Sequence, residues 1–200
     1  MEKGRNDNHP KKGSSIKVDP ITELKDLALI KKILANKPRD LCLFTLGINT
    51  NLRASDLRRV TAGQVRNLSP GDDLVIKERK TGKDRRITLN GVVVASIGSL
   101  LASRPYQDDD PLFLSKKGDK ALSVQSVNRL VKSWCREINL TGNYGSHTLR
   151  KTFGYMQRTQ RKTGIPELMA IFNHSSQKQT MDYLCIQPEE LRNAYMELEL

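Results

Sequence analysis

The stretch that does most to decide the fold lies near the C-terminus and is Asn173-His174-Ser175-Ser176-Gln177-Lys178-Gln179-Thr180-Met181-Asp182-Tyr183. A second stretch, upstream of it, is Ser146-His147-Thr148-Leu149-Arg150-Lys151-Thr152. If this second stretch is helical, His147 and Arg150 lie about one turn apart on one face. Such a pair can bind one phosphate, because arginine presents a planar fork of donors and histidine can donate a hydrogen bond and exchange a proton near neutral pH. A nearby tyrosine would complete a site for phosphoryl transfer.

The histidines support this interpretation by their distribution. The chain has three, His9, His147 and His174, and the two outside the N-terminal tail both fall in these stretches. Taken singly, a histidine in a polar helix is more often a surface or hydrogen-bonded residue than a catalyst, and the same holds for a single tyrosine. The interpretation therefore depends on whether further segments agree with it.

Two upstream segments do agree. The first is Leu46-Gly47-Ile48-Asn49-Thr50-Asn51-Leu52-Arg53-Ala54-Ser55-Asp56-Leu57, and the second is Lys77-Glu78-Arg79-Lys80-Thr81-Gly82-Lys83-Asp84-Arg85-Arg86-Ile87-Thr88-Leu89. Asp56 follows Arg53 by one helical turn, so it could hold the guanidinium in place. The alternative is an exposed ion pair that contributes roughly 0.3–0.5 kcal/mol.

Together these segments resemble the catalytic boxes of the tyrosine recombinase (phage integrase) family, in the same order. The family's first arginine lies in a T-G-L-R-x-S-E-L segment, which Thr50-Asn51-Leu52-Arg53-Ala54-Ser55-Asp56-Leu57 matches. Its lysine lies beside a hairpin turn, as in Lys80-Thr81-Gly82; its H-x-L-R box matches His147-Thr148-Leu149-Arg150, and its L-G-H-S-S box matches Phe172-Asn173-His174-Ser175-Ser176. The resemblance covers residues 46–183 and fills all six catalytic positions, with Arg53, Lys80, His147, Arg150, His174 and Tyr183.

The resemblance implies a catalytic domain that breaks and rejoins DNA, mainly α-helical with a small antiparallel β-sheet (an α+β fold). It implies a site-specific recombinase in which Tyr183 forms a 3′-phosphotyrosyl link, so that strands are rejoined without ATP. No metal and no other cofactor is expected. A tyrosine hydroxyl is a poor nucleophile at neutral pH until its proton is removed or its anion is stabilised, and cationic neighbours serve the second purpose.

Roles for the other residues follow from the charge that develops on the phosphate. Arg53 and Arg150 would bind the nonbridging oxygens, and His174 would add a donor. Lys80 would protonate the departing 5′-oxygen, with Lys83 as its rival for that role. His147 would assist proton transfer near the tyrosine.

Two departures from the family pattern lead to expectations. Asn51 and Asn173 stand where the family usually has glycine, and asparagine tolerates the left-handed backbone that glycine provides. The family usually has a separate N-terminal DNA-clamping domain, whereas only about fifty residues precede the Arg53 box. The chain is therefore expected to resemble short single-domain members such as the fimbrial-switch invertases, or an excised catalytic domain.

Charge indicates the partner. The 200 residues include 34 lysines and arginines against 22 acids, a net charge of +12, which suits a polyanion. Double-stranded DNA is the expected partner, with phosphate contacts from Lys77, Arg79, Lys83, Arg85 and Lys151, although a solvated charged ribbon would have the same composition. Other protomers are expected on the DNA, as a tetramer in the synapse.

Localisation is expected to be cytoplasmic, in a bacterial or phage system, because no long apolar stretch or signal peptide is found and no membrane partner is indicated. Cys42, Cys135 and Cys185 lack the paired spacings of zinc sites or disulfide frameworks, so buried thiols are expected.

Two other functions remain open at this point. Asp72, Asp73 and Glu78 with Lys80 could form a metal-dependent nuclease of the P-D…E-x-K type, which EDTA would inhibit. That alternative leaves both box histidines and Tyr183 without a role. The chain could also be a non-catalytic DNA-binding module on the recombinase scaffold, against which the complete set of catalytic residues argues.

Periodicity and capping residues outline the elements. Residues 1–18 are expected to form a disordered basic arm and residues 19–200 the catalytic domain. The predicted helices span residues 21–35, 39–48, 92–103, 123–137, 146–162, 166–173 and 189–198, with Asp19, Ser123 and Ser146 as caps. The predicted hairpin has strands at 74–80 and 85–89.

Overall fold

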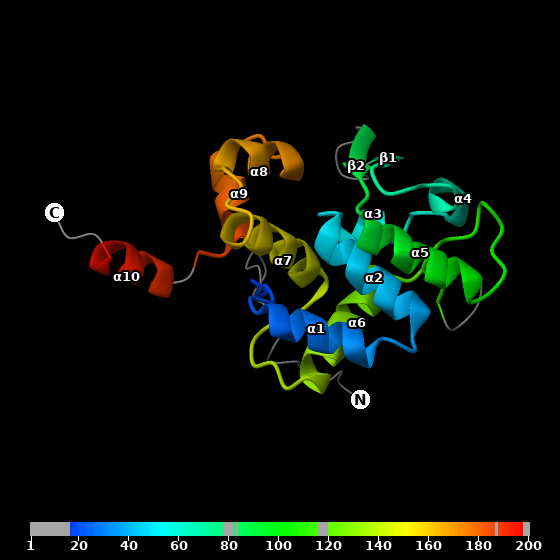
Figure 1. The fold of residues 1–200 in the computed structure, drawn as a ribbon, viewed down its shortest axis with the longest axis horizontal. Coiled ribbons are helices and arrows are strands. Elements are labelled where there is room, and N and C mark those ends of the chain that lie inside the picture. The colour runs from blue at the N-terminus through cyan, green and yellow to red at the C-terminus, as the bar shows by residue number, and fades with distance from the viewer. Residues whose placement is uncertain (1–16, 78–81, 83, 116–119, 187, 198–200) are drawn as a thin grey trace, which may run out of the picture.

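The computed structural model describes residues 17–77, 82, 84–115, 120–186 and 188–197 (Figure 1). In chain order the elements are α1 (Leu24–Ile33), α2 (Pro38–Asn49), α3 (Ala54–Leu57), α4 (Ala62–Val65), β1 (Asp73–Lys77), β2 (Asp84–Thr88), α5 (Gly91–Ala102), α6 (Val124–Glu137), α7 (Ser146–Thr159), α8 (Ile165–Phe172), α9 (Gln177–Leu184) and α10 (Pro188–Met196). Within these residues the chain is mainly helical with one small antiparallel sheet, as the sequence predicts.

Two predicted caps are wrong. The first helix begins at Leu24 instead of residue 21, because Asp19 is engaged elsewhere: its backbone N–H donates to the Asn143 carbonyl, and its carboxylate accepts from the Asn143 N–H at 2.8 Å. Ser146 is the first residue of α7, and Gly145 is the cap. The Gly145 N–H donates to the Thr148 hydroxyl at 3.0 Å, so the capping bond comes from inside the helix.

Three short helices were not predicted. The helices α3 and α4 have four residues each, and α9 has eight. Helices of this length have little stability of their own and depend on tertiary packing. None of the three has the proline at its start that marks the eight-residue α8. The predicted helix at 146–162 ends earlier, at Thr159, and Lys162 has a left-handed φ of 58°.

The sheet has one buried face. The strands pair antiparallel with Asp73 opposite Thr88 and Lys77 opposite Asp84, and Leu74, Ile76 and Ile87 are buried. This confirms the predicted hairpin for the described residues, while the residues predicted to form its turn lie mostly outside them.

Two apolar clusters form the core. The larger centres on α2 and α6, where the rings of Phe44 and Trp134 meet edge to face with centroids 5.9 Å apart. The smaller comprises Phe153, Leu168, Phe172 and Leu184, from α7, α8 and α9. Because Leu149 belongs to the first cluster and Phe153 to the second, α7 joins them. Side chains on α7 are therefore held from both sides.

The cysteines have no disulfide partners: Cys42 and Cys135 are buried and Cys185 is half-buried, so the expectation of buried thiols is confirmed for the first two. Burial raises the pKa of the Cys42 thiol to about 12. None of the helices formed by the described residues has the length and apolar character needed to cross a membrane.

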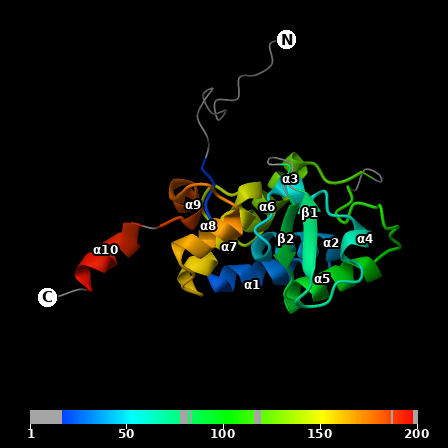
Figure 2. The ribbon, with the colours of Figure 1, turned by 90° about the horizontal axis from the view of Figure 1, so that it is seen from above.

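The last helix, α10, lies apart from the others, as both ribbon views show (Figures 1 and 2). Its apolar side chains Leu191, Tyr195 and Met196 are exposed, Tyr195 to 84%. An ion pair near its start joins it to α7, where the Arg158 guanidinium contacts both carboxylate oxygens of Glu190.

Candidate active site

Arg150 lies at the centre of the candidate site. It is 1% exposed and projects from α7. Its Nη1 donates to the backbone carbonyl of Asn51, and its Nη2 donates to the carbonyl of Phe172 at 3.1 Å. Two chain segments predicted to carry catalytic boxes thus meet at one guanidinium, whose orientation they fix.

Asn51 holds the first of these segments in place. It is fully buried and has φ of 54°, which confirms the predicted left-handed backbone. Its side-chain amide donates to the carbonyl of Ile171 at 3.0 Å. Asn173 is likewise left-handed, with φ of 53°, and ends α8. Asparagine at both positions therefore provides the turn for which the recombinase pattern usually has glycine.

Arg53 lies two residues after Asn51 and is the N-cap residue of α3. Its Nη1 lies 3.9 Å from Oδ2 of Asp56, whose side chain is 1% exposed. Burial of the carboxylate rules out the exposed-pair alternative for Asp56. The contact supports the other interpretation, in which this acid orients the guanidinium.

His174 is half-buried and lies directly beside Arg150. Its Nε2 lies 3.5 Å from Nη2 of Arg150, and its Nδ1 lies 3.1 Å from the hydroxyl of Thr180. Thr180 is fully buried on α9. Both ring nitrogens of His174 thus have polar neighbours within the same small region.

Tyr183, also on α9, packs its ring into this group. The ring centroid lies 5.3 Å from that of His174 and 5.3 Å from that of Phe172. The Arg150 guanidinium carbon lies 5.2 Å from the Tyr183 centroid and 4.9 Å from that of Phe172. A cation over an aromatic face is attracted by the ring, so the predicted nucleophile lies in a positive electrostatic environment.

His147 is in the first turn of α7, and part of its side chain is exposed. Desolvation by the surrounding protein lowers the pKa of this histidine, and the positive charges of Arg150, Arg53 and Lys151 lower it further. The imidazole is therefore neutral at neutral pH, the state in which it can accept a proton.

Some of the residues predicted to act as general acid or to contact DNA lie outside the described part of the chain. Lys80, its rival Lys83, and Arg79 lie outside the described residues. Lys77 is exposed at the end of β1. Arg85 differs from a solvated ribbon residue, because its Nη2 donates to the Ile171 carbonyl at 2.8 Å. It shares that acceptor with the Asn51 side chain.

Lys151 lies next to Arg150 in the sequence and is half-buried. It is close to Cys185, where burial raises the pKa of the thiol and the neighbouring lysine opposes this rise. Lys151 is therefore near the segment that carries Tyr183.

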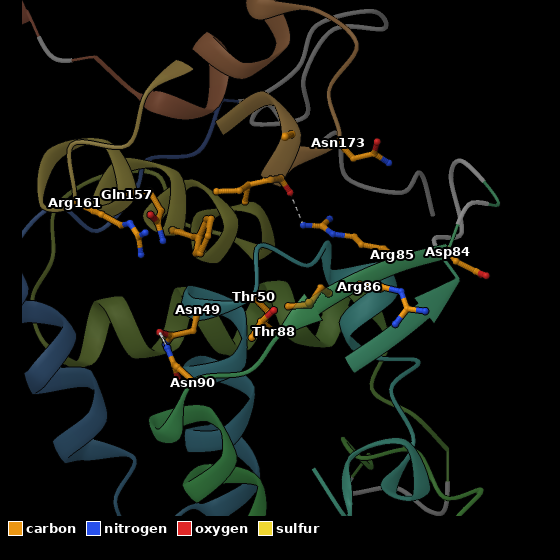
Figure 3. A pocket seen from close by; sticks show the side chains of 14 residues that line it. Asn49, Thr50, Asp84, Arg85, Arg86, Thr88, Asn90, Gln157, Arg161 and Asn173 are labelled. Atoms are coloured by element: carbon orange, nitrogen blue, oxygen red, sulfur yellow. Dashed lines mark hydrogen bonds between the residues drawn. The ribbon is translucent and has the colours of Figure 1, made fainter. Parts of the chain in front are cut away.

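A groove of about 620 Å³ adjoins the cluster (Figure 3). Arg85 and Arg86 from β2 face Gln157 on α7 and Arg161, which follows the end of α7, across it. Of the predicted catalytic residues, the five that the structure describes, Arg53, His147, Arg150, His174 and Tyr183, do not line this groove. The groove meets the site at Asn173, which directly precedes His174, and at Arg85 and Ile171, which are hydrogen-bonded to each other.

The acids of the nuclease alternative have other partners where they are described. Asp72 accepts from the Ser69 N–H at 2.8 Å, and Asp73 accepts from the Thr88 hydroxyl at 2.7 Å. Glu78 lies outside the described residues. Within the described part of the chain, no cluster of three or more histidine, cysteine or acidic side chains could hold a metal ion.

Sequence reasoning missed three contributors to the site: the Asn51 carbonyl, Phe172 and Thr180. The first two lie inside the predicted boxes, but a backbone acceptor and a packing ring carry no sequence signal of their own. Thr180 stands one turn before Tyr183, so it shares a face with the tyrosine if that segment is helical. Because α9 was not predicted, the shared face of Thr180 and Tyr183 was not recognised.

We expect Gly154→Ala to impair the site. A Cβ there would lie 2.8 Å from Cζ of Phe172 and 3.1 Å from the carbonyl oxygen of Tyr183. The ring or the tyrosine backbone must shift, at a cost of roughly 1–3 kcal/mol in the free energy of unfolding. Urea denaturation would measure this loss, with Gly98→Ala as the control because open space surrounds that position. Equal stability of the two variants would contradict the close packing of α7 against Tyr183.

Comparison with known proteins adds an independent line of evidence. The family model described as "Phage integrase family" matches residues 21–190. The probable integrase/recombinase YoeC of Bacillus subtilis (strain 168) is 36% identical over 179 residues, which cover 89% of this chain and 95% of the relative. The tyrosine recombinase XerC of Caldanaerobacter subterraneus subsp. tengcongensis is 32% identical over 162 residues, which cover 79% of this chain and 44% of that relative.

Solved structures share the fold. The crystal structure of XerA recombinase superposes with a TM-score of 0.74 at 18% identity, over 94% of this chain and 66% of that one. XerH site-specific recombinase bound to palindromic difH substrate superposes with a TM-score of 0.73 at 19% identity, over 91% of this chain and 53% of that one. The chain thus spans nearly all of the Bacillus relative and about half to two thirds of the other recombinases.

Proposed function

The chain belongs to the phage integrase family, and from this premise we propose that it is a site-specific DNA recombinase that cleaves and rejoins strands through a 3′-phosphotyrosyl intermediate. The observation that carries the proposal is the meeting of three separate boxes at one guanidinium: Arg150 contacts the Asn51 carbonyl, the His174 ring and the Tyr183 ring. A fold that gathered these residues for stability alone would have little use for a buried cation beside two polar aromatic side chains.

In the proposed reaction the Tyr183 oxygen attacks the scissile phosphorus. A bond forms between tyrosine and the 3′-phosphate, and the bond from phosphorus to the 5′-oxygen breaks. The 5′-oxygen takes a proton from Lys80, or from Lys83 in the alternative assignment. A free 5′-hydroxyl then attacks the phosphotyrosine, which restores the phosphodiester and releases the tyrosine.

The surrounding residues stabilise this reaction electrostatically. Arg53 and Arg150 are proposed to bind the nonbridging oxygens, with Asp56 orienting Arg53 and His174 adding a donor. The lowered pKa of His147 keeps the ring neutral at neutral pH, which supports its role as acceptor of the tyrosine proton.

The partners are proposed to be double-stranded DNA and further copies of the chain, as a tetramer in the synapse. The net charge of +12 favours DNA, and Lys77, Arg79, Lys83, Arg85 and Lys151 are the proposed phosphate contacts. We propose that residues 19–200 form the catalytic domain, preceded by a basic arm, and that the protein acts in the bacterial cytoplasm.

Covalent capture tests the proposed function. Nicked suicide duplexes with randomised sequence would be incubated with the protein, and adducts would be isolated on a denaturing gel and sequenced. We expect adducts that form equally in the presence of EDTA. Cleavage without an adduct, and inhibited by EDTA, would instead establish the metal-dependent nuclease.

The exposed helix α10 is proposed to couple protomers, because family members commonly exchange a C-terminal helix on DNA and its apolar side chains are uncovered here. Truncation after Ile186 is expected to leave a folded protein that cleaves poorly and does not assemble on paired sites. Light scattering of the DNA complexes would measure assembly.

A second variant distinguishes the role of α10 itself from the role of its ion pair with α7. Glu190→Gln removes the charge that pairs with Arg158 and keeps α10. It should assemble nearly as the parent does, since a partly exposed ion pair contributes about 1 kcal/mol or less. Unchanged assembly of the truncated protein would show that α10 serves its own protomer only.

A further inference from the structure

The neighbours of His174 determine which of its two ring nitrogens donates a hydrogen bond and which accepts one. The hydroxyl of Thr180 lies 3.1 Å from Nδ1, and Nη2 of Arg150 lies 3.5 Å from Nε2. A guanidinium only donates hydrogen bonds, so any hydrogen bond across this contact has Nε2 as its acceptor. A neutral imidazole that accepts at Nε2 carries its hydrogen on Nδ1, and this hydrogen then points at the threonine hydroxyl.

This tautomer is the wrong one for binding a phosphate. Phosphate oxygens accept hydrogen bonds, so a neutral His174 must carry its hydrogen on Nε2 to donate to one. The threonine hydroxyl has both a hydrogen and lone pairs, so it can accept from Nδ1–H or donate to a bare Nδ1. Either tautomer therefore keeps a partner at Nδ1.

We propose that Thr180 is a positioning residue whose hydroxyl lets His174 change from the Nδ1–H tautomer in the free protein to the Nε2–H tautomer on the scissile phosphate. The inference rests on the proposed recombinase function. One proton leaves Nδ1 and one joins Nε2 by exchange with water, so the net charge of the ring is unchanged. The hydroxyl reverses its role from acceptor to donor.

The contact between Thr180 and His174 also lies close to the proposed nucleophile, Tyr183. Thr180 and Tyr183 are one helical turn apart, and the centroids of the His174 and Tyr183 rings lie 5.3 Å apart. Thr180 is fully buried, so water cannot readily replace its hydroxyl. A valine there would fill the space and leave Nδ1 without this partner.

The test combines three variants. Thr180→Val removes the hydroxyl, Thr180→Ser retains it, and Thr152→Val is the matched control. Thr152 is also fully buried, and its hydroxyl accepts one hydrogen bond, from the Ile21 N–H at 2.9 Å. All three would be compared by single-turnover cleavage at saturating DNA and by DNA affinity, with a duplex recovered by covalent capture.

We expect Thr180→Val to cleave about tenfold more slowly with unchanged affinity, as for the loss of one ordinary hydrogen bond. Thr180→Ser should recover to within about threefold of the parent, and Thr152→Val should cleave normally. Parental cleavage by Thr180→Val, or equal slowing by Thr152→Val, would overturn the proposal.

Imidazole ¹⁵N chemical shifts give a readout that simple packing would not change. In the free protein we expect His174 to carry its hydrogen on Nδ1, and in the duplex complex of the Tyr183→Phe protein on Nε2. A free protein with Nε2–H would overturn the proposal even if no duplex were captured or Thr180→Val did not fold. Failure of the parent to form any adduct would instead count against the recombinase function.

Discussion

Tyr183→Phe is expected to abolish the covalent protein–DNA adduct and to leave DNA affinity nearly unchanged. The substitution removes only the hydroxyl, so the ring can keep its contacts with Phe172, His174 and the Arg150 guanidinium. Without an oxygen nucleophile, no phosphotyrosyl bond can form. Denaturing gel electrophoresis would detect the adduct, and a gel-shift titration would measure affinity.

A matched control is available in Tyr195→Phe, because Tyr195 is 84% exposed on α10. This variant should form as much adduct as the parent. Persistence of the adduct in Tyr183→Phe would remove Tyr183 from the nucleophile's role, and Tyr195 and Tyr155 would then be the next to substitute.

Arg150→Ala is expected to slow cleavage by about 10²–10³-fold, the loss that follows removal of one preorganised donor to a developing oxyanion. It should also destabilise the protein, because the carbonyls of Asn51 and Phe172 lose a buried donor. Each unsatisfied buried group costs roughly 1–3 kcal/mol in the free energy of unfolding. Single-turnover cleavage and urea denaturation would measure the two effects separately.

Arg53→Ala is the comparison that separates chemistry from folding. The side chain of Arg53 is 17% exposed, so its loss should slow cleavage to a similar degree while costing less stability. Near-parental cleavage by either folded variant would remove that arginine from the phosphate site. Slow cleavage by Arg150→Ala alone, in proportion to its unfolding, would assign Arg150 a structural role.

The sequence was sufficient for the family, the mainly helical fold and the left-handed turns at Asn51 and Asn173, because each rests on local residue type. It did not reveal α9, because Gln177–Leu184 is mostly polar and lacks the initial proline and the apolar run that mark the equally short α8. Packing against α7 and α8 stabilises α9 instead. The contact between Thr180 and His174 was therefore hidden, although both residues were in the most informative stretch.

The hairpin shows a signal that was present but unused. Side chains alternate across a strand, so Arg85 shares a face with the buried Ile87, and Arg86 points the other way. This alternation predicts that Arg85 turns toward the protein, as its hydrogen bond to Ile171 demonstrates. What it could not predict was the acceptor, because the end of α8 is 86 residues away in sequence.

The end of α8 has a consequence for the newly made chain. Its Ile171 carbonyl is bound by residues 120 and 86 positions away, and its Phe172 carbonyl is bound by Arg150. Contacts of such sequence separation form only after long loops close, late in folding. A chain still emerging from the ribosome, or partly unfolded, therefore holds its arginines and its tyrosine apart. The capacity to break DNA is therefore expected only of the finished fold.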